Sequence, residues 1–86
     1  MGKKIIWARD DAYSCEYTAR RGDFAAVIVP PEVTGEDGWG YQIFDEADED
    51  AMDHGEWYTE AHGITSRDAA RRIAETILKE LARGRK

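Results

Sequence analysis

The strongest constraint on the fold comes from the C-terminal segment, which has the periodicity of an amphipathic helix. Its apolar residues recur at spacings of three and four: Ala70, Ile73, Ala74, Ile77, Leu78 and Leu81. This spacing predicts a helix over Ser66–Arg83 that buries one stripe against another layer of structure. Thr65 is the expected N-cap, with Asp68 reaching back to its amide, and Gly84 ends the helix.

Five segments before this helix have the composition or the alternation of β-strands. They are Lys3–Arg9, Tyr13–Ala19, Phe24–Val29, Trp39–Phe44 and Glu56–Ala61. Gly22 can take a positive φ, which predicts a hairpin between the second and third segments, and two prolines end the third. We therefore expect the α+β class, with an antiparallel meander of four to five strands packed against one C-terminal amphipathic helix. The 86 residues suffice for a single compact domain, residues 1–86.

Charge is segregated along the chain. No Lys or Arg occurs between Gly22 and Ser66, and the rest of the chain holds all 12 basic residues. The stretch without basic residues has twelve acids: Asp23, Glu32, Glu36, Asp37, Asp45, Glu46, Asp48, Glu49, Asp50, Asp53, Glu56 and Glu60. Repulsion among the like charges of Asp45–Asp53 predicts a mobile acidic loop. Two interpretations remain: solvated loops that serve solubility, or a negative surface that attracts a basic protein.

The composition also bears on partners and location. Affinity for phosphate needs a basic stripe, so at a net charge of −6 we expect no direct binding of nucleic acid. The longest apolar run has six residues, Phe24–Val29, whereas a membrane-spanning helix needs about 20. No apolar region follows the basic start, so we expect no secretory signal. The single Cys15 cannot form an internal disulfide and is expected to be a small buried residue. A cytoplasmic protein without membrane contact is predicted.

No catalytic or metal-binding set is recognisable in the sequence. His54 and His62 lack the spacing of metal ligands. A calcium loop that opened at Asp48 would need glycine where Asp53 stands and a closing glutamate where Thr59 stands. We therefore expect no catalytic residue, no metal ligand and no cofactor.

The three tryptophans fall in different predicted strands. We expect Trp7 and Trp57 in the core. Trp39 lies between Gly38 and Gly40, near the acidic segments, and its position in the core or as an exposed binding residue stays open. The outer face of the predicted helix is basic: Arg67, Arg71, Lys79 and Arg83. We interpret this face as solvated and suited to the negative end of the helix dipole, with a patch for an acidic partner or nucleic acid as the alternative.

In size, charge and architecture, the chain resembles the small acidic proteins that phages and mobile elements direct against host nucleic-acid machinery. Anti-CRISPR proteins and other DNA mimics are examples. The resemblance covers the whole chain and includes no motif, so it assigns no role to a single residue. It implies binding by occlusion, in which carboxylates take the place of phosphates against a groove lined by Arg and Lys.

These observations favour a non-enzymatic protein-binding module that inhibits a nucleic-acid-binding host protein through an acidic surface. The alternatives are a generic accessory domain that forms a homodimer, or a small cytoplasmic protein without a mimic role. The expected partner is a basic protein surface. The predicted partner-binding residues are taken from the segment without basic residues: Glu36, Asp37, Trp39, Asp45, Glu46, Asp48, Glu49, Asp50, Asp53 and Glu56.

Overall fold

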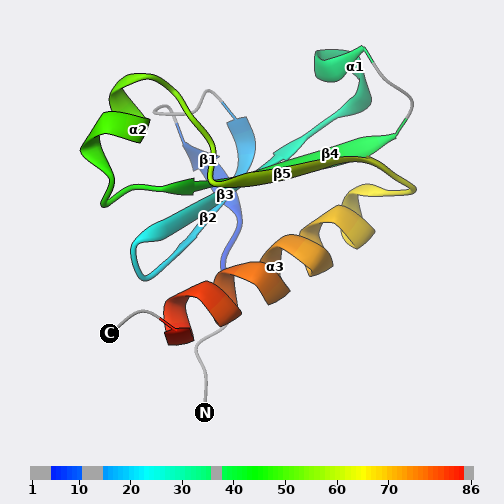
Figure 1. Ribbon diagram of the computed structural model, residues 1–86. Helices are drawn as coiled ribbons and strands as arrows, with labels where there is room; N and C mark the ends of the chain where they lie inside the picture. Colours follow the sequence, from blue (N-terminus) through cyan, green and yellow to red (C-terminus); the bar gives the residue numbers. More distant parts are fainter. Residues whose placement is uncertain (1–4, 11–14, 36–37, 85–86) are drawn as a thin grey trace.

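Five strands form one antiparallel sheet in the order β1-β2-β3-β4-β5, so each strand pairs with its neighbour in sequence. The computed structural model describes residues 5–10, 15–35 and 38–84. The strands are β1 (Ala8–Asp10), β2 (Cys15–Arg21), β3 (Phe24–Val29), β4 (Trp39–Asp45) and β5 (Thr59–Ile64). The helices are α1 (Pro31–Thr34), α2 (Glu49–Asp53) and α3 (Arg67–Gly84). The predicted α+β class, with a meander sheet on a C-terminal helix, is confirmed, and α3 crosses one face of the sheet (Figure 1).

The central strand β3 is buried on both of its faces. Phe24, Ala26 and Ile28 belong to the core cluster with α3, and the alternate residues Ala25 and Val27 are also buried. A strand buried on both faces needs a continuous apolar run instead of an alternating one. The run Phe24–Val29 supplies it, and the observed bounds of β3 match the predicted bounds.

The hairpin between β2 and β3 is confirmed. Arg21 pairs with Phe24, which leaves a two-residue turn in which Gly22 has a φ of 60°. A side chain at Gly22 would meet α3 as well, because an added Cβ would lie 3.3 Å from the Cβ of Ala82. The turn therefore needs glycine both for its backbone conformation and for its close approach to the helix.

Helix α3 begins one residue later than predicted, and its N-cap differs. The Oγ of Ser66 accepts a hydrogen bond from the amide of Ala69 at 3.1 Å, so Ser66 takes the role expected of Thr65. The carboxylate of Asp68 lies 3.8 Å from the Arg71 guanidinium, one turn along the helix. The expected capping box is therefore wrong, and Asp68 takes part in ion pairs on the surface of α3.

Only part of the apolar stripe predicted for α3 is fully buried. Ala70, Ala74 and Leu78 are fully buried, and they define the line of contact with the sheet. Ile77 and Leu81 are partly buried beside this line. Ile73 is 43% exposed, so the expectation that it packs in the core is wrong. Adjacent residues of an α-helix are 100° apart around its axis, so Ile73 is rotated by 100° from Ala74. This rotation takes its side chain beyond the surface of α3 that contacts the sheet.

Two residues before β1, Ile5 and Trp7, pack against the same core as α3. Trp7 is half-buried against the core cluster, as expected, and its Nε1 donates a hydrogen bond of 2.6 Å to the Glu75 carboxylate. This bond joins the segment before β1 to the middle of α3. The carboxylate of Glu75 is thereby placed against the indole.

We expect truncation of Leu78 to destabilise the protein much more than truncation of Ile73. Leu78→Ala should lower the free energy of unfolding by about 2–5 kcal/mol, because it leaves a cavity at the centre of the core. Ile73→Ala should change it by less than about 1 kcal/mol, because that side chain is already half in water. Urea unfolding followed by circular dichroism measures both. Equal losses in the two variants would contradict the observed orientation of α3.

Candidate acidic binding surface

The predicted acidic loop contains a short helix. Glu49–Asp53 form α2, and the Asp48 side chain caps it by accepting a hydrogen bond from the amide of Ala51 at 3.2 Å. Glu49 and Asp50 lie in the first turn, where negative charge interacts favourably with the helix dipole. The expectation of a loop is therefore wrong for Glu49–Asp53, which are helical. Their mutual repulsion is opposed by the cap and by the dipole.

The chain before α2 is joined to the β2–β3 hairpin. The amide of Glu46 donates to the carbonyl of Asp23 at 2.8 Å. The Arg20 Nε lies 2.9 and 3.1 Å from the two carboxylate oxygens of Glu46. Asp45 ends β4, and its Oδ1 accepts a hydrogen bond from the amide of Ala47 at 3.0 Å. Asp45 and Glu46 thus form and anchor the turn that leads into α2.

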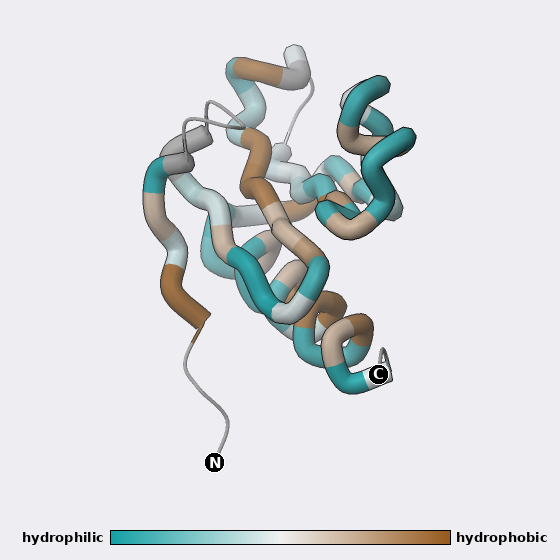
Figure 2. Tube along the Cα trace, turned by 90° about the vertical axis from the view of Figure 1, so that its left-hand side faces the viewer, coloured by the Kyte–Doolittle hydropathy of each residue, from teal (hydrophilic) through white to brown (hydrophobic). Residues whose placement is uncertain are grey.

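The chain after α2 is also ordered by hydrogen bonds. The Nδ1 of His54 lies 2.8 Å from the carbonyl oxygen of Asp50, so this nitrogen is the donor, because a carbonyl only accepts. Gly55 has a φ of 68°, and the amide of Glu56 then donates to the carbonyl of Ala51 at 2.8 Å. We call residues 45–56 the acidic α2 segment. It projects from one end of the sheet, and hydrophilic residues prevail along it (Figure 2).

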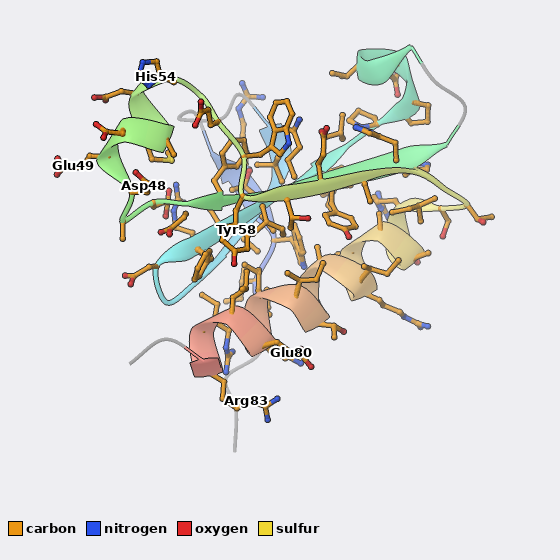
Figure 3. The ribbon with its side chains drawn as sticks, in the orientation of Figure 1. Asp48, Glu49, His54, Tyr58, Glu80 and Arg83 are labelled. Carbon is orange, nitrogen blue, oxygen red and sulfur yellow. The ribbon has the colours of Figure 1, made fainter. Side chains whose placement is uncertain are left out.

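Five carboxylates of the acidic α2 segment are exposed: Asp48, Glu49, Asp50, Asp53 and Glu56. Glu49 points away from the sheet (Figure 3). Asp45 and Glu46 are half-buried in the turn. The structure therefore brings together seven of the predicted site residues, of which five are presented to solvent.

Trp39 does not lie with these acids. It begins β4, whereas Asp45 ends the same strand, and six steps along a strand cover about 20 Å. Figure 1 shows α1, which precedes β4 in the chain, and the α2 segment at opposite ends of the sheet. Trp39 is half-buried and packs against the core. Glu36 and Asp37 lie outside the described residues. The predicted site is thus divided, and its described acidic part is the α2 segment.

The structure places Trp57, expected in the core, partly in solvent. Trp57 is 48% exposed and Tyr58 is 57% exposed. The predicted strand began at Glu56 and so included Trp57, but β5 begins only at Thr59. The strand therefore does not extend back to Trp57. Gly55 and Glu56, which precede the tryptophan, are the signal in the sequence that the strand starts later.

The two histidines serve separate local structures. His62 Nε2 lies 3.1 Å from Oε2 of Glu60, and the Gln42 amide donates to the same oxygen at 3.4 Å. The His62 ring lies over Gly40, where an added Cβ would be 2.5 Å from its Nδ1. Within residues 5–10, 15–35 and 38–84, no three His, Cys, Asp or Glu residues gather to hold a metal ion. The side chain of Cys15 lies outside the described part.

The basic face of α3 is partly engaged within the chain. The Arg67 guanidinium donates to the Tyr17 hydroxyl at 2.8 Å and lies 5.0 Å from the centroid of the Tyr17 ring. Arg71 is half-buried beside Asp68. On this face, Arg67 and Arg71 thus have partners within the chain. Lys79 and Arg83 lie further along the helix and are exposed.

Comparison of the chain with protein families, curated proteins and solved structures gives no match. Among the helices that the described ranges contain, none combines the length and the apolar character needed to cross a membrane.

The cap of α2 can be tested by two substitutions at one position. Asp48→Ala removes the acceptor for the Ala51 amide and should destabilise α2 by about 1 kcal/mol. Asp48→Asn keeps an acceptor oxygen and should retain most of the helix. Amide hydrogen exchange at Ala51 measures the effect, with faster exchange expected in the alanine variant alone. Equal exchange in all three proteins would show that another interaction orders the segment.

Proposed function

We propose that the chain is a non-enzymatic protein-binding module that contacts a basic surface of another protein through the acidic α2 segment. One observation carries this proposal: five exposed carboxylates are held on an ordered segment of a stretch that contains no Lys or Arg. A concentrated negative surface attracts basic partners and speeds their association. Because the segment is already folded, binding costs less ordering entropy than a disordered acidic tail would require.

The partner class that fits this surface is a nucleic-acid-binding protein of the cytoplasm. Such proteins present Arg and Lys in grooves that receive phosphates. The exposed carboxylates on α2 and in the turns beside it offer negative charge to such a groove. Occupation of the groove would exclude nucleic acid, and the expected consequence is inhibition.

The structure identifies which acids a functional test should change. Asp45, Glu46 and Asp48 support the turn and the helix cap. Glu49, Asp50, Asp53 and Glu56 are exposed and lie outside these contacts. Substitution of the second group therefore changes the charge and preserves the observed hydrogen bonds.

A fourfold variant, Glu49→Gln, Asp50→Asn, Asp53→Asn and Glu56→Gln, should bind the partner at least tenfold more weakly than the parent. Single changes should have small effects, since exposed ion pairs contribute about 0–1 kcal/mol each. The loss should appear chiefly in the association rate, with a flatter dependence on salt. The measurement is capture from a nuclease-treated lysate of the source cells, followed by kinetics with the captured protein.

The matched control is the basic face of α3. The double variant Arg71→Gln and Lys79→Gln should keep the affinity of the parent within about twofold. If this variant loses binding and the fourfold variant keeps it, the basic face is the interface and the proposal is wrong. Circular dichroism of all variants establishes that each is folded.

Direct binding of the chain to duplex DNA should be undetectable at physiological salt, because the exposed acids repel phosphates. The control double variant should behave in the same way. A gel shift at low micromolar protein in about 0.15 M salt, close to physiological ionic strength, measures this. A shifted band that weakens in the α3 double variant would favour the basic face as a nucleic-acid surface.

A further inference from the structure

An exposed aromatic pair directly follows the acidic α2 segment. Trp57 and Tyr58 are 48% and 57% exposed, and they connect this segment to β5. Large aromatic side chains that remain in solvent are typical centres of binding energy, and Trp is the most enriched type. These two side chains were not among the predicted binding residues.

The backbone on both sides of the pair is fixed. The amide of Glu56 bonds to the Ala51 carbonyl of α2, and the amide of Tyr58 bonds to the Ile43 carbonyl of β4. The ring of Tyr58 also packs edge-on against the buried ring of Phe24, with 5.5 Å between the centroids. Tyr58 is seen between β5 and α3 in Figure 3. The backbone of the pair and the ring of Tyr58 are therefore held in place before any partner binds, which lowers the entropic cost of contact.

The charges nearest to Trp57 along the chain are negative. Glu56 precedes it, Asp53 ends α2, and Glu60 follows in β5. Two arginines, Arg20 and Arg21, end β2 at this end of the sheet, and Arg20 is paired with Glu46. An exposed indole that is flanked in sequence by carboxylates complements a group that is both cationic and planar, because the face of the indole attracts a cation and carboxylates accept hydrogen bonds.

We propose that Trp57, assisted by Tyr58, binds arginine side chains of a basic protein segment in preference to lysine. The guanidinium stacks on the indole and donates to neighbouring carboxylates, whereas an ammonium group lacks the planar face. The chain already contains such a contact, since Arg67 lies over the ring of Tyr17 and donates to its hydroxyl. This inference rests on the proposed function and specifies the chemistry of its partner.

The test compares two peptides of equal length and charge, nona-arginine and nona-lysine. Binding of each labelled peptide is measured by fluorescence anisotropy at low and at physiological salt. The parent should bind nona-arginine more tightly than nona-lysine. We define the preference ratio as the affinity for nona-arginine divided by the affinity for nona-lysine, and Trp57→Leu should lower this ratio by about two- to fivefold. Its affinity for nona-lysine should change little. Trp57→Phe keeps an aromatic face and should give an intermediate ratio.

Val33→Ala is the matched control, because Val33 is 71% exposed and belongs to α1, away from the α2 segment. It should keep the ratio of the parent. An unchanged ratio in Trp57→Leu overturns the inference and leaves the proposed function standing, provided that the fourfold acidic variant loses both peptides. If the parent binds neither peptide at low salt, both proposals are wrong. If Trp57→Leu does not fold, an unchanged ratio in Trp57→Phe overturns the inference.

Discussion

The remaining structure depends on the close contact between α3 and the two strands β3 and β4. Ala70 and Ala74 place small side chains at this contact, and Ala26 does the same on β3. Small residues let the helix approach the sheet, while Leu78, Phe24 and Ile43 fill the space beside them. The outer strands β1 and β5 pack less against α3, so their positions rely on pairing with β2 and β4.

The acidic α2 segment depends on this framework through the β2–β3 hairpin. Asp23 and Arg20 hold Glu46, and Glu46 in turn fixes the start of the turn that leads to α2. The segment has many carboxylates and is nevertheless ordered, although repulsion among like charges usually favours disorder. Hydrogen bonds to the backbone make this combination possible, because such bonds constrain the chain without neutralising the exposed carboxylates.

Much of the fold follows from periodic patterns in the sequence. The continuous apolar run of β3 and the three- and four-residue spacing of α3 predict these elements with bounds that are correct or one residue off. Thr65 and Ser66 are adjacent hydroxyl residues, and local chemistry does not distinguish which one caps the helix. The exposure of Ile73 depends on where the helix axis lies over the sheet, which no pattern within α3 encodes.

The candidate site is less predictable than the fold. The acids of residues 45–56 are adjacent in sequence and therefore stay together in space, as expected. Trp39 was grouped with them by sequence context, but the length of β4 separates it from Asp45. The turn before α2 is anchored by Arg20 and Asp23, which are distant from it in sequence, so this anchoring could not be read from the acidic run. Trp57 was misassigned because β5 begins two residues after it.

The turn at Gly22 and Asp23 has consequences for how a chain of this fold can vary in length. It is contacted from one side by Ala82 of α3 and from the other by the amide of Glu46. An inserted residue there would disturb the helix and the acidic α2 segment together. By contrast, the connection at Gly35 has open space where a side chain would project. Insertions, tags and natural variation in length are better accommodated beside α1, at the end of the sheet that carries none of the exposed α2 carboxylates.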